Sequence, residues 1–224
     1  MNQLHFADIN QRHIGRAIAI QAQTIGEHTF LLADERRLSF SEVNRQVNEL
    51  AAGLAARGLT VGERLAFYME SGPEVILLAL AANKLGAAWV PINTEYKGDW
   101  LEDTIRRSRP KMLVTDTQYA GRVAQVRERL ALEHILVHGG SGELPGSTKL
   151  SAVAVAGAGE PDMSGFSCGD ICSVLWTSGT TGKSKGVMQS HNVFFNAVEG
   201  ASTQFGVAAD DIVYSVLPMY NTAA

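Results

Sequence analysis

The chain has 224 residues, of which 46% are hydrophobic and 19% are charged. This much apolar material can form a sizeable core, so intrinsic disorder is excluded. With 19 basic and 23 acidic side chains, the formal net charge is −4, which provides no general attraction for nucleic acid or an anionic membrane. The two cysteines, Cys168 and Cys172, are too few for a disulfide framework. We interpret them as buried thiols rather than zinc ligands.

No apolar run has the ~20 residues that a membrane span requires. The most apolar stretch, Val75 to Ala82, is interrupted by Asn83 and Lys84. The N-terminal sequence lacks the basic and then apolar order of a signal peptide. We therefore expect a cytoplasmic protein without a membrane partner.

Short apolar runs alternate along the chain with amphipathic stretches. The first helix signal is a capping box formed by Ser39 and Glu42, and Pro73 lies in the first turn of a later helix. The predicted strands are Thr29–Ala33, Arg37–Phe40, Arg64–Met69, Ala88–Ile92, Met112–Thr115, His134–His138, Ile171–Trp176 and Ile212–Val216, with a short extended piece at Val187–Gln189. The predicted helices run from Ser39 to near Gly58, from Pro73 to Leu85, and over Asp99–Ser108, Tyr119–Leu130 and Asn192–Phe205.

This alternation predicts an α/β fold, with parallel βαβ sheet layers flanked by helices. Ligands bind such sheets at the carboxyl ends of the strands. We predict a first α/β subdomain over residues 1–138 and a Gly-, Ser-, Ala- and Pro-rich connection over 139–165. Residues 166–224 would begin the next sheet segment. The last residues neither complete a fold nor form a polar tail, so the fold is expected to be incomplete.

A loop rich in glycine and hydroxyl groups follows the strand Ile171–Trp176, with the sequence TSGTTGKSKG. Glycines let successive backbone N–H groups converge on an anion, hydroxyls add donors, and lysine adds a cation for phosphate oxygens. The pattern is typical of a polyphosphate site. Its composition alone favours a surface loop of small polar residues over such a site. The candidate ligands are Thr177, Ser178, Gly179, Thr180, Thr181, Gly182, Lys185 and Gly186.

Three other motifs fit this chain less well. A P-loop would need glycine at Thr177. The esterase pattern G-x-S-x-G matches around Ser184, but its strand ends several residues too early, and His191 is the only histidine that follows. A dinucleotide-binding fingerprint near Gly146 has its last glycine one residue late, and no helix begins there.

The segment TSGTTGKSKGV resembles the phosphate-binding signature of the adenylate-forming, or AMP-binding, enzymes, a family that includes acyl-CoA synthetases, luciferases and peptide-synthetase adenylation domains. The stretch from LSFSEV to WVPIN resembles the opening of that family, and LPMYN resembles its next motif. INTEYKGDWLEDTIRRSRPKMLVTD is most similar to acyl-CoA synthetases. The family usually has proline where this chain has Ser184, and many members have histidine or an aromatic residue at the position of Asn221.

The resemblance implies activation of a carboxylic acid by ATP to an acyl-adenylate, followed by thioester formation with coenzyme A. It places the β- and γ-phosphates on the loop, magnesium on Thr177, and the acid near Tyr220 and Asn221. The parts of the family that carry the adenine, ribose and catalytic-lysine sites, including the C-terminal domain, have no counterpart here. The chain is therefore expected to be inactive alone, with no catalytic residue of its own. A non-catalytic binding module is the alternative, and a serine esterase is a second one.

Several other side chains have simpler interpretations. His134 and His138 lie four apart in a strand, where metal binding is not expected. We interpret Arg106, Arg107, Arg109 and Lys111 as a solvated helix C-terminus, His191 and Asn192 as the start of a helix, and Trp89, Trp100 and Trp176 as packing residues. Because the missing domains would leave apolar surface bare, we also expect self-association.

Overall fold

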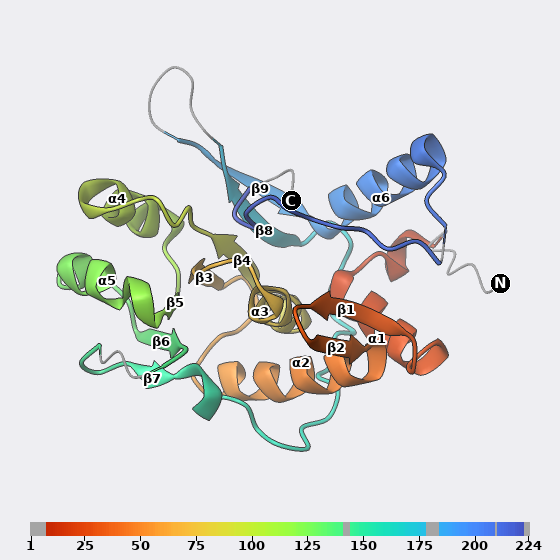
Figure 1. Cartoon of the computed structure of the whole chain (residues 1–224), viewed down its shortest axis with the longest axis horizontal. Coiled ribbons are helices and arrows are strands. Elements are labelled where there is room, and N and C mark those ends of the chain that lie inside the picture. Colours follow the sequence, from red (N-terminus) through yellow and green to blue (C-terminus); the bar gives the residue numbers. More distant parts are fainter. Residues whose placement is uncertain (1–7, 141–143, 178–183, 209, 222–224) are drawn as a thin grey trace.

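The computed structural model describes residues 8–140, 144–177, 184–208 and 210–221. Among these residues, a seven-stranded sheet has the order β7-β6-β5-β3-β4-β8-β9, and β1 pairs with β2 in a separate hairpin (Figure 1). The strands are β1 (Thr29–Ala33), β2 (Arg36–Ser39), β3 (Arg64–Tyr68), β4 (Ala88–Pro91), β5 (Met112–Asp116), β6 (His134–His138), β7 (Thr148–Lys149), β8 (Ile171–Trp176) and β9 (Gly186–Ser190). The helices are α1 (Ile14–Thr24), α2 (Phe40–Ala55), α3 (Pro73–Lys84), α4 (Gly98–Ser108), α5 (Ala120–Arg127) and α6 (His191–Phe205).

All neighbouring strands from β7 to β8 pair in parallel, whereas β9 pairs with β8 antiparallel. The parallel strands therefore end at one common edge of the sheet. The predicted α/β class is confirmed. Because β8 pairs with β4, strands from both sides of the 139–165 connection share one sheet. The division of the chain at that connection stays a prediction.

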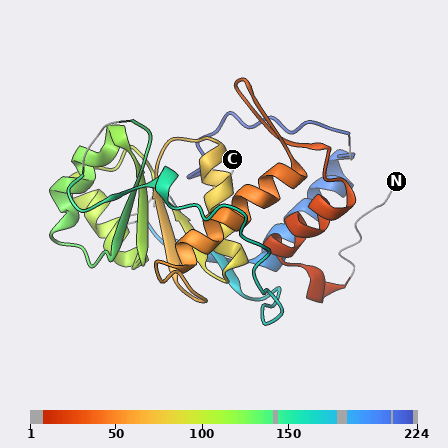
Figure 2. The same cartoon turned by 90° about the horizontal axis from the view of Figure 1, so that it is seen from below.

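Helices cover both faces of the sheet, and alternate residues of each central strand face opposite sides. Leu65 and Phe67 of β3 pack into a cluster with α2 and α3, whereas Ala66 and Tyr68 pack with α4 and α5. In Figure 2 the strands run between α4 and α5, in green, and α2 and α3, in orange and yellow. Near-continuous apolar strands are the expected result of burial on both faces.

Local sequence signals explain where these helices begin. The Ser39 hydroxyl accepts from the Glu42 N–H at 3.2 Å, and the Glu42 carboxylate accepts from the Ser39 N–H at 2.7 Å, so the predicted capping box is present. Pro73 occupies the first turn of α3, as predicted. Within the described residues, no helix has the length and apolar character needed to cross a membrane.

The segment Ile212–Val216, predicted as a strand, is not one. It lies outside any hydrogen-bonded ladder of the described residues, and Ile212, Val213, Tyr214 and Val216 have exposed fractions of 72–86%. High β-propensity forms a strand only where a neighbouring strand provides hydrogen-bond partners, and this segment has none among the described residues.

Other differences are smaller. The helix predicted over Tyr119–Leu130 begins with a 3-10 turn and ends at Arg127. The connection contains β7 and a further 3-10 turn, Leu150–Ala152. Trp100 is 59% exposed on α4 rather than packed, because it lies on the outer face of that helix and contacts only the ring of Tyr96 among the aromatic residues described.

Candidate functional site

The ends of the glycine-rich loop are joined at the carboxyl end of β8. The Thr177 N–H donates to the Lys185 carbonyl at 2.9 Å, and the Lys185 N–H donates to the Thr177 hydroxyl at 3.4 Å. These contacts continue the antiparallel pairing of Trp176 with Gly186 by one more pair. The loop therefore begins at the edge where parallel sheets bind ligands.

Three of the predicted phosphate ligands are described, and all three are exposed: Thr177, Lys185 and Gly186. The remaining five lie outside the described residues: Ser178, Gly179, Thr180, Thr181 and Gly182. Gly186 allows close packing at the base of the loop. A Cβ there would lie 3.1 Å from the Val174 side chain and 3.5 Å from the Trp176 ring. The β8–β9 hairpin therefore favours glycine at this position for packing.

Helix α4 contacts both ends of the loop. The Arg107 guanidinium donates to the Ser184 carbonyl at 2.9 Å and lies over the Trp176 ring, 4.7 Å from its centre. The Trp176 indole N–H donates to the Ser108 hydroxyl at 3.1 Å. The hydroxyls of Tyr96 and Ser184 are 3.2 Å apart. Interpretation of Arg107 as part of a solvated helix terminus therefore missed its main contacts.

The surroundings of Ser184 do not form an esterase site. Ser184 is buried, with 7% exposed, and the segment that follows it is strand β9 rather than a helix. The ring nitrogen Nδ1 of His191 accepts from the Ile14 N–H at 3.2 Å, and His191 packs against His13. Ser184 thus lacks the exposed turn between strand and helix that a nucleophile of this type needs.

The predicted acid-pocket residues lie in a turn anchored close to the same edge of the sheet. The Met219 N–H donates to the hydroxyl of Ser71, which follows β3, at 2.8 Å. The Asn221 N–H closes the turn by donating to the Pro218 carbonyl at 2.8 Å. Tyr220 is half-buried and Asn221 is exposed. Since only β4 separates β3 from β8, this turn and the loop approach the same edge.

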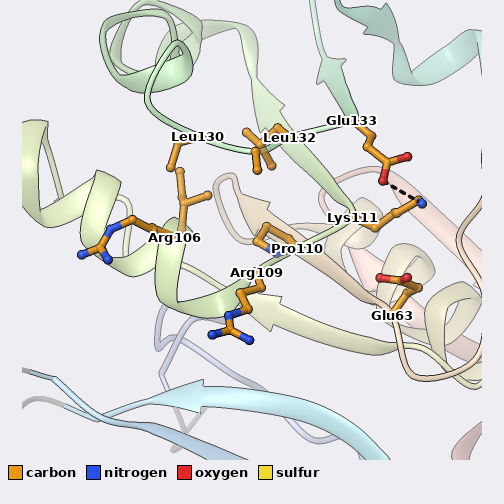
Figure 3. A pocket seen from close by; sticks show the side chains of 10 residues that line it. Glu63, Arg106, Arg109, Pro110, Lys111, Leu130, Leu132 and Glu133 are labelled. Carbon is orange, nitrogen blue, oxygen red and sulfur yellow. Dashed lines mark ion pairs between the residues drawn. The ribbon is translucent and has the colours of Figure 1, made fainter.

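A separate cavity of about 400 Å³ lies at the opposite, amino edge of the sheet (Figure 3). Arg106, Arg109 and Lys111 line it together with Glu133, which pairs with Lys111 at 2.8 Å. Arg106 pairs with an acidic residue of its own helix. Arg106 and Arg109 lie at the C-terminal end of α4, where cations are favourable, whereas Lys111 directly precedes β5.

The histidines, cysteines and carboxylates of the described residues do not gather into a candidate metal cluster. No group of three or more histidine, cysteine, aspartate or glutamate side chains there could hold a metal ion. His134 and His138 are the end residues of β6. Burial raises the pKa of the Cys172 thiol to about 12, so it is an inert core group, whereas Cys168 is only half-buried.

Together these features define a class: an α/β protein with a glycine- and hydroxyl-rich loop at the carboxyl edge of a parallel sheet. The sequence profile of the family described as "AMP-binding enzyme" matches residues 18–224. The chain belongs to this family, and the resemblance predicted from its motifs is confirmed.

The relatives include CoA ligases and peptide synthetases. A 3-[(3aS,4S,7aS)-7a-methyl-1,5-dioxo-octahydro-1H-inden-4-yl]propanoyl:CoA ligase of Rhodococcus jostii (strain RHA1) is 29% identical over 227 residues, which cover 92% of this chain and 43% of the ligase. Tyrocidine synthase 2 of Brevibacillus parabrevis is 29% identical over 190 residues, which cover 85% of this chain and 5% of the synthase.

Two solved structures have the same fold over most of this chain. ATP-bound MatB from Rhodopseudomonas palustris is 26% identical with a TM-score of 0.73, and the match covers 94% of this chain and 41% of MatB. A long-chain-fatty-acid-CoA ligase (FadD1) from Archaeoglobus fulgidus is 24% identical with a TM-score of 0.80, and the match covers 94% of this chain and 42% of FadD1. The chain thus spans less than half the length of each of these relatives.

Proposed function

We propose that the chain binds the β- and γ-phosphates of ATP, as part of an enzyme that activates a carboxylic acid and transfers the acyl group to coenzyme A. The observation that carries this proposal is the closed base of the loop, where Thr177 and Lys185 pair directly after β8. Membership of the AMP-binding family and the CoA ligases among its relatives support it.

In the proposed reaction a carboxylate oxygen attacks the α-phosphorus of ATP, and the bond from that phosphorus to pyrophosphate breaks. The coenzyme A sulfur then attacks the acyl carbon and AMP leaves. The loop would hold the outgoing phosphates in place, and the ammonium group of Lys185 would stabilise their negative charge. The turn with Tyr220 and Asn221 would lie beside the acid.

Magnesium would neutralise charge on the phosphates. The Thr177 hydroxyl suits that ion, because it is an exposed oxygen at the end of a strand, and magnesium usually takes only one or two protein ligands beside phosphate oxygens and water. In the described structure this hydroxyl already accepts from the Lys185 N–H. A metal would use the other lone pair of this oxygen.

Replacement of Lys185 by alanine tests the proposal. Because the variant loses a cation at the base of the loop, we expect ATP affinity to fall about tenfold, measured by titration calorimetry with magnesium present. Lys149→Ala, which removes an exposed lysine on β7, is the matched control and should leave affinity unchanged. Equal ATP affinity in Lys185→Ala and the parent chain would contradict a phosphate-binding role.

Catalysis is measured separately, as carboxylate-dependent exchange of labelled pyrophosphate into ATP. Exchange by the 224-residue chain would show that it completes the adenylation step alone. ATP binding without exchange would place the chain among binding modules, because the phosphate site would then work without the remaining steps.

A further inference from the structure

We infer that Arg107, on α4, is a positioning residue for the phosphate loop, a role that rests on the phosphate-binding function proposed above. Arg107 contacts the residue before the loop and a residue at its end. Its guanidinium lies over the ring of Trp176 and donates to the carbonyl of Ser184. Trp176 and Ser184 directly flank the Thr177–Lys185 pair that closes the loop.

The guanidinium is itself held in position by its own helix. Arg107 Nη1 donates to the Asp103 carboxylate at 3.3 Å, one helical turn earlier, and to Ser184 at 2.9 Å. A planar guanidinium can stack on an aromatic ring and donate in its plane at the same time, which an ammonium group cannot do. The two contacts therefore fix the separation between Trp176 and Ser184.

Two further contacts reach the same two residues. The Trp176 indole donates to Ser108, the last residue of α4, and the hydroxyl of Tyr96, which precedes α4, contacts the Ser184 hydroxyl. Contacts from α4 and from Tyr96 thus reach the end of β8 through Trp176 and the residue two positions before β9 through Ser184. Serine does not fix its backbone φ as proline does, so these partners help to set the position of Ser184.

The amide hydrogens of Thr177 and Lys185 report on the order of the loop base without any ligand. In Arg107→Ala we expect their hydrogen exchange to accelerate about tenfold, because the loss of a charge-assisted hydrogen bond and a stacked guanidinium loosens the base. We also expect the affinity for inorganic tripolyphosphate to fall five- to tenfold.

Arg107→Lys should fall between the parent chain and Arg107→Ala, because lysine keeps the charge and one donor but does not reproduce the planar stack. Arg106→Ala is the matched control. Arg106 is the adjacent residue and pairs with the same Asp103, but has no contact with the loop among the described residues. Its loss should change neither exchange nor affinity.

If Arg107→Ala does not fold, Tyr96→Phe provides the milder variant. It removes only the hydroxyl contact with Ser184 and should accelerate exchange at Lys185.

Unchanged exchange at Thr177 and Lys185 in Arg107→Ala would overturn the inference, as would equal acceleration in Arg106→Ala. An Arg107→Lys variant that matches the parent chain in both measurements would also overturn it, because charge alone would then explain the effect. Failure of the parent chain to bind tripolyphosphate would contradict the proposed function instead, while the exchange measurements would still decide whether Arg107 orders the loop base.

Discussion

Lys84, the last residue of α3, has a completely buried side chain. Its ammonium group donates to the side-chain carbonyls of Asn44 and Asn48 at 2.6 and 2.7 Å, and to the carboxylate of Glu160. Burial lowers the pKa of Lys84, and Glu160 opposes that shift. This cluster joins α2, α3 and the connection before β8.

Glu160→Gln leaves that buried cation without a negative partner, and we expect it to lower the free energy of unfolding by about 3 kcal/mol. Adding Lys84→Met should recover much of the loss, because it removes the unpaired charge. Urea denaturation measures both. Arg45→Ala is the control. It breaks an exposed ion pair with Glu49 on α2 and should lower the free energy of unfolding by less than about 0.5 kcal/mol. A Glu160→Gln variant as stable as the parent chain would show that the two asparagines suffice.

The glycine-, hydroxyl- and lysine-rich pattern pointed to a candidate phosphate site after β8, but not to the residues that contact its two ends. Glycines, hydroxyls and a lysine after a buried strand indicate an anion site wherever the strand lies. Arg107 carries no such signal, because arginine at a helix C-terminus is ordinarily solvated. Its contact with Ser184 spans 77 positions and exists only because β8 pairs with β4, which precedes α4. The pairing of β8 with β4 cannot be predicted from a single sequence when the fold is not known.

Helix α1 illustrates the same limit at the scale of an element. No serine, threonine, aspartate or asparagine marks its start, and our sequence analysis did not predict it. Two histidines cap it instead. His13 Nδ1 accepts from the Arg16 N–H at 3.3 Å, and His191 Nδ1 accepts from the Ile14 N–H at 3.2 Å. The second cap comes from α6, so tertiary structure completes the signal.

This arrangement makes α1 sensitive to acid. Burial lowers the pKa of His13 to about 3 and that of His191 to about 4, with Arg16 contributing in the same direction and Asp170 opposing. Both values lie below the 6.5 of an unfolded histidine, so the unfolded chain binds more protons below that pH. The contribution of these two histidines to stability is therefore fully present above about pH 7, and it is lost as the pH drops towards 4. At pH 5 the lowered pKa of each histidine reduces the free energy of unfolding by about 2 kcal/mol.

The His13→Asn variant separates capping from titration. Asparagine is a good N-cap that does not titrate, so it should keep the Arg16 contact and make the loss of stability between pH 7 and 5 shallower. Thermal unfolding across that range measures the slope. His28→Asn alters an exposed histidine and serves as the control. Parallel stability curves for the parent chain and His13→Asn would contradict a contribution from His13.

At the scale of the whole molecule, the alternation of strands and helices was sufficient to predict the class of fold. Continuous apolar runs such as those of β3 and β5 are typical of burial between helical layers, and both runs lie there. The order of the strands could not be predicted from the sequence, because hydrophobic patterns do not specify which strands are neighbours. The short β7 has too few residues to produce a pattern at all.

The failed strand prediction at Ile212–Val216 leads to a further expectation. Four apolar side chains of this segment are largely exposed, and such a run of high β-propensity favours association with another chain. Replacing Val213 by lysine and Tyr214 by serine should therefore lower concentration-dependent self-association, followed by light scattering after size exclusion. The melting temperature should change little, because both residues are more than 80% exposed and contribute little buried area.

Val61→Ser removes an exposed apolar residue elsewhere in the chain and should leave association as it was. A parent chain that stays monomeric at every concentration would contradict this expectation, since these side chains would then tolerate water without a partner.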